Sequence, residues 1–201
     1  LEKKEVCFVA APIPQYFTGL AKHLPPNQQT VLLLVAPHSE AGMRDMVAQH
    51  GGQVTYRKTA DEVASSHKTL LEYTWNHTTL HALKVDKGLT YIQSGFNPMH
   101  RLKQVKALEA ALKGEVMMHL EFLRTKEGAF NCSGLQIIRY TTEERLNQIM
   151  QIYRDHGVQI NNPHVYIVED GKQNNLDPAV VGMKRRFDPQ GLLNPGKLRS
   201  W

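Results

Sequence analysis

The hydrophobic positions of this sequence change their spacing repeatedly, from every second residue to every third or fourth. Alternate spacing is typical of a strand with one buried face, and the longer spacing is typical of an amphipathic helix. The pattern therefore predicts short strands interleaved with helices, in an α+β fold.

Residues 89–170 show this pattern most clearly. Strands are expected at residues 89–94, 115–123, 135–140 and 165–168, and helices at residues 97–114 and 141–157. Strand, helix, two strands, helix, strand is the ferredoxin-like βαββαβ order. This order gives a largely antiparallel sheet covered by helices.

Both helices of this unit have recognisable sequence signals. The apolar stripe of the first helix is expected to contain Leu102, Val105, Leu108 and Leu112. Thr141 and Glu144 predict a capping box at the start of the second helix. The segment 124–133 between the two middle strands is longer than a tight hairpin needs.

The rest of the chain is divided around this unit. Residues 1–60 predict an incomplete ferredoxin-like βαβαβ unit, with strands at 6–10, 31–36 and 53–57 and helices at 12–24 and 39–51. Residues 61–88 are expected to form a connecting helix and an irregular segment. Residues 171–201 are expected to contain a helix capped by Asp177 and an extended C-terminal tail. The two ferredoxin-like units would pair into one wide sheet.

Composition narrows the class of protein. The chain has 201 residues, is 41% hydrophobic and carries a net charge of +5, so it can bury a proper core. Its basic residues are spread out apart from residues 184–186, and Tyr91 and Tyr140 lie in no RNA-recognition consensus, so we expect no nucleic-acid partner. Cys7 and Cys132 cannot form a disulfide framework, which favours a cytoplasmic protein. No apolar run is long enough to span a membrane.

Residues 187–201 form a turn-rich tail, with Asp188-Pro189, Gly191 and Asn194-Pro195-Gly196 as its turn signals. Its order, Phe-Asp-Pro-x-Gly-x-Leu-Asn-Pro-Gly-Lys, resembles the closing motif of FAD-linked oxidases of the vanillyl-alcohol oxidase and glycolate oxidase type. The resemblance implies that Asn194, Gly196 and Lys197 lie near the flavin. A lysine there would favour the negative charge of a reduced flavin. The alternative is a polar tail that caps the fold.

The same resemblance implies that this chain is a C-terminal cap, or substrate, domain. The sequence has no glycine-rich loop for a pyrophosphate, and Gly51-Gly52 is its only adjacent glycine pair. We therefore expect an N-terminal FAD-binding domain to be missing from the chain. By itself the chain is expected to bind no FAD and to be inactive.

Four histidines are candidates for a substrate site. His164 occupies the region where hydroxy-acid members of that family carry a Glu-His-Gly motif, and it is a candidate to accept a substrate proton. Only the histidine of that motif is present, because Val165 and Tyr166 follow it. A histidine hydrogen-bonded within the fold is the alternative for His164.

His77 and His81 are spaced like two metal ligands on a helix. We expect no metal, because Thr78 stands where a zincin has its glutamate and the family's Gly-Asp-Gly-Asn-x-His segment is absent. Two interpretations of this pair remain: the histidines line the substrate pocket, or they belong to a partly buried helix without a functional role.

His119 lies on the expected strand 115–123, sharing a face with Met117 and Glu121, while residues 116, 118, 120 and 122 form the apolar face. In a cap domain the face of His119 would cover the flavin and contact substrate. A solvated sheet surface explains His119 and Glu121 equally well.

The expected function is thus FAD-dependent oxidation of a hydroxyl-bearing small molecule by hydride transfer to the flavin. A 2-hydroxy acid is one candidate substrate, although the motifs of the hydroxy-acid enzymes are missing. The alternative, from another class, is a non-catalytic ferredoxin-like module that binds a small ligand or RNA.

Overall fold

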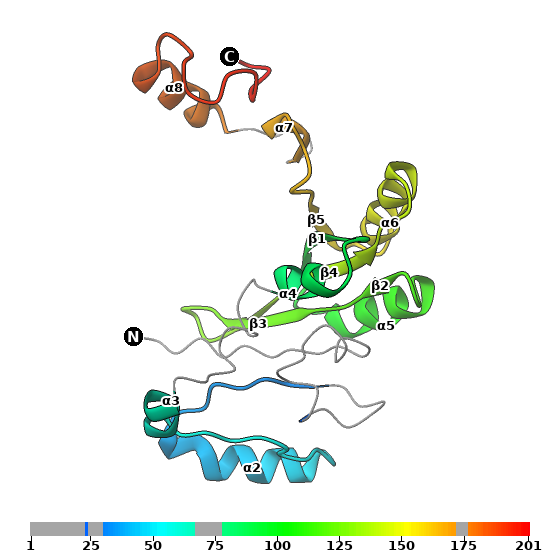
Figure 1. Ribbon diagram of the computed structural model, residues 1–201, viewed down its shortest axis with the longest axis vertical. Helices are drawn as coiled ribbons and strands as arrows, with labels where there is room; N and C mark the ends of the chain where they lie inside the picture. The colour runs from blue at the N-terminus through cyan, green and yellow to red at the C-terminus, as the bar shows by residue number, and fades with distance from the viewer. Residues whose placement is uncertain (1–22, 24–29, 67–77, 172–176) are drawn as a thin grey trace. The chain divides into compact units, whose positions relative to one another are not determined.

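The computed structural model describes residues 23, 30–66, 78–171 and 177–201 (Figure 1). The chain divides into two compact units, Leu1–Gln159 and Ile160–Trp201. The predicted elements at 6–10 and, apart from His23, at 12–24 lie outside the described residues. Within the described part the fold is α+β, with helices beside a five-stranded sheet, as the sequence predicted.

The sheet has the strand order β2-β4-β1-β5, with β3 also paired to β4. Its strands are β1 (Leu89–Phe96), β2 (Val116–Met117), β3 (Leu120–Arg124), β4 (Phe130–Arg139) and β5 (Gln159–Asn161). β2 and β3 pair antiparallel with β4 in one continuous register, and β4 pairs antiparallel with β1. β4 thus separates β1 from the next strand in sequence, which is the split βαβ arrangement of a ferredoxin-like unit.

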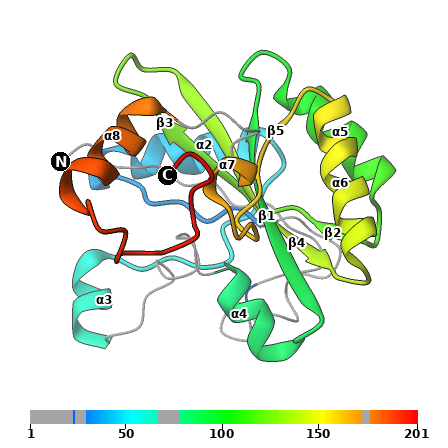
Figure 2. The ribbon, with the colours of Figure 1, turned by 90° about the horizontal axis from the view of Figure 1, so that it is seen from above.

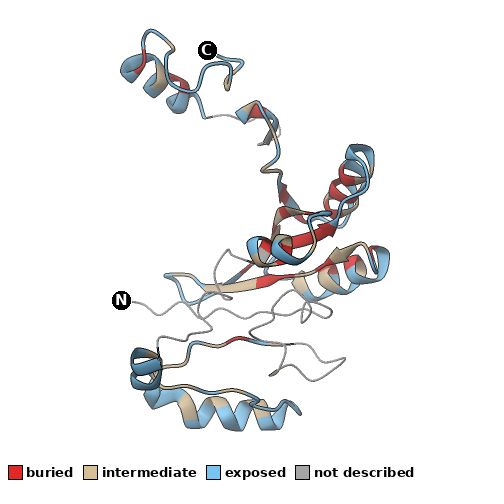
Figure 3. Ribbon diagram, in the orientation of Figure 1, coloured by how far each residue is buried: buried red, intermediate tan, exposed pale blue. Residues whose placement is uncertain are grey.

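Helices cover this sheet. α5 (Arg101–Ala111) follows β1, and α6 (Glu143–Asp155) follows β4. The two helices lie together on one side of the sheet, and α4 (Thr78–Val85) lies on the other side (Figure 2). Figure 3 shows buried residues along β1, β4 and one side of α6. The predicted ferredoxin-like order is therefore confirmed, but its last strand is β5 and not the predicted segment 165–168.

The amide of Gln104 joins the two covering helices to the end of β1. Its Oε1 accepts the N–H of Asn97 at 3.0 Å, and its Nε2 donates to the carbonyls of His156 and Gly157 at 3.0 Å each. Gln104 is buried with Leu108 and Leu112, whereas Leu102 is 66% exposed. The predicted stripe was therefore wrong at Leu102. The helix instead turns Gln104 inward, where its amide has hydrogen-bond partners.

Several predicted boundaries need correction. Thr142, not Thr141, caps α6, because its Oγ1 accepts the N–H of Arg145 at 3.1 Å. The strands β3 and β4 extend into segment 124–133 and are joined by residues 125–129, where Gly128 takes a φ of +85°. Residues 165–167 form no strand, and α7 (Val168–Gly171) begins at the predicted strand's last residue.

The described N-terminal part contains helices but no strand. α2 (Glu40–Gln49) follows the short 3-10 helix η2 (Pro37–Ser39), and α3 (Ala60–Ser66) follows a loop. Residues 31–36 and 53–57, predicted as strands, are irregular and leave Leu34 and Val54 more than 40% exposed. Glu40 links α2 to the loop, because its carboxylate accepts two hydrogen bonds of 2.9 Å from the Arg57 guanidinium. The guanidinium groups of Arg57 and Arg44 lower the pKa of Glu40 to about 2.

A buried polar contact crosses the centre of the sheet. Gln136 of β4 is fully buried; its Oε1 accepts the N–H of His119 at 3.2 Å, and its Nε2 donates to Oγ of Ser94 on β1 at 2.9 Å. The amide passes over Gly134, where a Cβ would overlap Nε2 of Gln136 and lie 2.5 Å from Oγ of Ser94. A glycine at this position is therefore required for the contact.

Gly134→Ala is expected to destabilise the protein by about 1–3 kcal/mol, because the new methyl group must displace the Gln136 amide. Gly42→Ala is the matched control, since nothing lies within 4 Å of its added Cβ in α2. It should be neutral or stabilising by up to about 1 kcal/mol. Urea unfolding of the two variants measures the difference, and equal midpoints would contradict the account.

Candidate functional site

One face of the sheet carries a group of polar side chains. Residues paired across antiparallel strands share a face, and Gln93 pairs with Leu135, Tyr91 with Ile137, and Glu121 with Ser133. His119 lies two residues before Glu121, and its carbonyl accepts the N–H of Leu135 at 3.1 Å. We call this group the sheet patch; its members are Tyr91, Gln93, His119, Glu121 and Ser133.

His119 is the most buried member of the sheet patch. It is 0% exposed, and its Nε2 lies 3.5 Å from Oε1 of Glu121. Burial lowers the pKa of His119 to about 3, since a charged imidazole would lose its hydration there. The ring is therefore neutral at physiological pH and can exchange hydrogen bonds, but it supplies no positive charge. The alternative of a solvated histidine does not fit a fully buried ring.

The other predicted histidines lie elsewhere. His81 is half-buried in α4, which contacts β1 and β4, while His77 lies outside the described residues. His164 is exposed between β5 and α7, and its backbone N–H donates to Oδ1 of Asn162 at 3.0 Å. His119 and His164 belong to different compact units.

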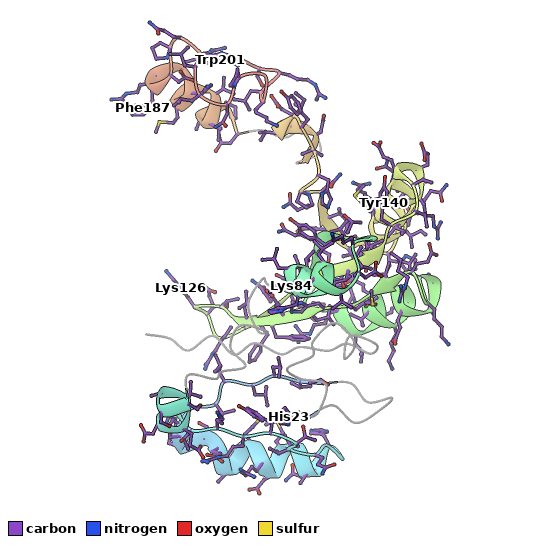
Figure 4. All side chains as sticks on the ribbon, in the orientation of Figure 1. His23, Lys84, Lys126, Tyr140, Phe187 and Trp201 are labelled. Atoms are coloured by element: carbon purple, nitrogen blue, oxygen red, sulfur yellow. The ribbon has the colours of Figure 1, made fainter. Side chains whose placement is uncertain are left out.

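The C-terminal tail is folded against the helices of its own unit. α8 (Pro178–Phe187) begins at Asp177, whose Oδ1 accepts the N–H of Ala179 at 2.9 Å, as the sequence predicted. Residues 188–201 then contain neither helix nor strand. Figure 4 shows Phe187 at the end of α8 and Trp201 at the end of this tail.

Asp188 fixes the first turn of the tail. Its carboxylate is buried and accepts the backbone N–H groups of Leu192 and Leu193 at 2.8 and 3.0 Å, together with the ammonium group of Lys184. The Lys184 ammonium, followed by these backbone donors, lowers the pKa of Asp188 below its ordinary value. Lys184 also lies 5.2 Å from the ring centroid of Trp201. The start and end of the tail are thus tied to the same lysine.

The Asn-Pro-Gly-Lys segment has a defined conformation. Asn194 and Gly196 both have positive φ values, +47° and +73°, and Asn194 is the only non-glycine residue of the described chain with a positive φ. Lys197 follows, with Nζ 3.6 Å from the ring centroid of Tyr166, a cation–π contact. The carbonyl of Lys197 accepts the N–H of Val168 at 2.9 Å. This turn is therefore built by specific contacts and holds Lys197 partly exposed.

The end of the tail is held by α7. Glu169 is buried, and its Oε1 accepts the N–H groups of Arg199 and Ser200 at 2.9 and 3.2 Å and the Ser200 hydroxyl at 2.7 Å. Asp170 pairs with the guanidinium of Arg199 at 2.6 Å. Glu169 and Asp170 are thus the residues of α7 that bind the tail.

Among the described residues, the resemblance points to one charged side chain for a flavin, that of Lys197. Lys197 offers a positive charge suited to the ring of a reduced flavin. A pyrophosphate needs a run of free backbone N–H groups. At Gly51 and Gly52 the chain instead closes α2, because their N–H groups donate to the carbonyls of Ala48 and Val47 at 3.0 and 2.8 Å.

Local sequence patterns contain little sign of the residues that support these sites. Gln136 stands in an apolar strand segment after Gly134, and this single polar residue was the available signal. Tyr166 was read only as a departure from a motif, although it contacts Lys197 and would lie 3.4 Å from a Cβ at Gly196. Both roles depend on contacts between residues distant in the sequence.

No protein-family model matches this sequence, and no curated protein matches it. Within the described ranges, no group of three or more His, Cys, Asp or Glu residues is arranged to hold a metal ion. None of the described helices has the length and apolar character needed to cross a bilayer.

The tail is expected to lose stability at low pH. Because the pKa of Asp188 is lowered in the folded state, its stabilising contribution is complete above the pKa of the unfolded carboxyl group. That contribution is lost as the pH falls through the lower pKa of the folded state. Trp201 fluorescence in a Trp75→Phe background should report this acid transition.

Asp188→Asn should weaken that transition, because the amide does not titrate in this range and pairs poorly with Lys184. Glu169, whose pKa is also lowered by its contact with Ser200, still binds the end of the tail. Asp155→Asn, at the exposed end of α6, is the matched control and should retain the transition. An unchanged acid transition in Asp188→Asn would show that another group holds the tail.

Proposed function

We propose that this chain is the C-terminal, substrate-binding part of an FAD-dependent oxidoreductase that oxidises a hydroxyl-bearing small molecule. The observation that carries the proposal is the Asn194–Lys197 turn. Its positive φ values and its contact with Tyr166 give Lys197 a defined conformation, and the motif that this turn resembles lies near the flavin in those oxidases. A separate FAD-binding domain is the partner that the proposal requires.

The proposal gives this chain's residues distinct tasks. Bound FAD would take the hydride, and with it the electron pair, from the carbon that carries the substrate hydroxyl. Lys197 would stabilise the negative charge that the flavin gains. His164, which is exposed, is the candidate to accept the hydroxyl proton, and its neighbour Tyr166 contacts the tail.

The sheet patch is the proposed substrate surface. The neutral ring of His119 is fully buried beside Glu121, so it would support this surface from within, and Gln136 fixes the backbone from which His119 projects. His81, on the helix that covers β1 and β4, is a second proposed contact. We also propose a cytoplasmic location, where the buried Cys132 thiol, with its pKa raised to about 11 by burial, would remain reduced.

The intact polypeptide purified from its natural source provides the test. Its visible absorption, recorded anaerobically, should show an oxidised flavin that bleaches when a hydroxyl-bearing substrate is added. A folded full-length protein without flavin, and without uptake of added FAD, would contradict the proposal. That outcome would favour the non-catalytic ferredoxin-like binding module, which the topology accommodates equally well.

A further inference from the structure

Large apolar side chains are exposed on α8 and on the tail that follows it, each to between 42% and 72%. They are Val180, Met183, Phe187, Leu192, Leu193 and Trp201. We call these residues the tail surface, and Figure 4 labels Phe187 and Trp201. Val180, Met183 and Phe187 are three and four residues apart, so they share one side of α8, whereas Val181 is the buried residue of this helix. α8 thus buries one side and exposes a second apolar side.

The tail surface continues from the end of α8 onto the turns of the tail. The Asp188 carboxylate accepts the N–H groups of Leu192 and Leu193 at 2.8 and 3.0 Å, which holds both leucines beside the last turn of α8. A Cβ at Gly191 would lie 2.9 Å from Nε1 of Trp201, so the indole ring packs against the same turn. Helix and tail therefore contribute to one surface.

Positive charge is concentrated in the same segment, residues 178–201. Its basic residues are Lys184, Arg185, Arg186, Lys197 and Arg199, and Asp188 is its acidic residue. Asp188 is buried and paired with Lys184, while Arg199 is paired with Asp170 of α7. Arg185 and Arg186 are exposed at the end of α8. Their charge favours an anionic partner for this end of the unit.

A cation also lies against the tail surface itself. The guanidinium of Arg186 is 5.3 Å from the ring centroid of Phe187, which is 65% exposed. If Phe187 entered the core of a protein interface, the guanidinium would lose its hydration, and charged residues are depleted from such cores. At a bilayer surface the ring enters the boundary of the acyl chains while the guanidinium stays among the lipid phosphates. The combination favours an anionic lipid surface over a protein.

We propose that the tail surface binds reversibly to an anionic phospholipid bilayer. Phe187, Leu192 and Leu193 enter the boundary of the acyl chains, and Arg185 and Arg186 bind lipid phosphates. Tryptophan is enriched at bilayer interfaces, which suits the exposed Trp201. Lys197, which the proposed function assigns to the flavin, is not among these contacts. The membrane contact is therefore a second partner of this chain, independent of its redox chemistry.

Co-sedimentation of the intact polypeptide with lipid vesicles tests the proposal. Vesicles of phosphatidylcholine mixed with phosphatidylserine should bind the protein at least about tenfold more tightly than vesicles of phosphatidylcholine alone. Added salt should weaken this binding, because it screens the arginine–phosphate attraction. Absence of binding to the anionic vesicles would overturn the proposal and leave another protein domain as the partner of the tail surface. Equal binding to both kinds of vesicle would overturn the role of the arginines.

The double variant Arg185→Gln with Arg186→Gln should bind anionic vesicles at least about tenfold more weakly, because each cation near the surface contributes to the attraction. The matched control is Lys103→Gln with Lys106→Gln, which removes the same charge from the exposed side of α5. It should bind like the wild type. An equal loss in both double variants would show that binding follows only the net charge of the chain, and would overturn the assignment to the tail surface.

Phe187→Ala tests the apolar contribution and should weaken vesicle binding about 5- to 20-fold, since the ring no longer enters the bilayer. Leu102→Ala, at another position that is 66% exposed, is its control and should leave binding unchanged. Wild-type binding by Phe187→Ala would contradict insertion of the tail surface. Thermal unfolding of each variant checks that the fold is intact.

Discussion

The amide of Gln136 is the contact on which the central sheet depends. It is fully buried, and an unpaired amide in that position would cost about 1–3 kcal/mol. Both of its ends are paired, one with the backbone of His119 and the other with Ser94. The contact joins β1, β4 and the link between β2 and β3. Gly134 leaves the space that this side chain occupies.

The Gln136 contact also positions His119, a residue of the candidate site. The N–H of His119 binds the Gln136 side chain where β2 and β3 are interrupted, so the backbone of His119 is fixed from inside the sheet. Its imidazole lies on the opposite face, beside Glu121. In the second unit Asp188 has a comparable task, because one buried carboxylate binds Lys184 and two backbone N–H groups of the tail. Both sites are thus organised by a single buried polar group.

The sequence predicts the parts of this fold that rest on local signals. Period-two spacing in β1 and β4, the Asp177 cap and the glycine that ends α6 are all local, and they define the ferredoxin-like order. The sequence misses features that depend on distant partners. Leu102 fits a helical stripe but is exposed, because Gln104 turns inward and donates to two carbonyls just after α6. Residues 31–36 are apolar enough for a strand but have no paired strand among the described residues.

In the candidate sites too, local signals identify some residues, and distant contacts determine their environments. His119 was identified from its strand, and Lys197 from the order of the tail motif. Their environments depend on Gln136 and Tyr166, whose roles no spacing rule reveals, since each acts through a contact across many residues. Burial of His119, which keeps its ring neutral, likewise follows from the packed sheet and not from its neighbours in sequence.

The folded tail is proposed to present Lys197 to a flavin. The most direct test is the midpoint potential of the flavin in the intact protein carrying Lys197→Gln, beside Lys103→Gln on the exposed surface of α5. Loss of the positive charge should lower the potential, by about 30 mV for each tenfold loss in preference for the reduced flavin. A potential equal to that of the wild type and of Lys103→Gln would contradict the account.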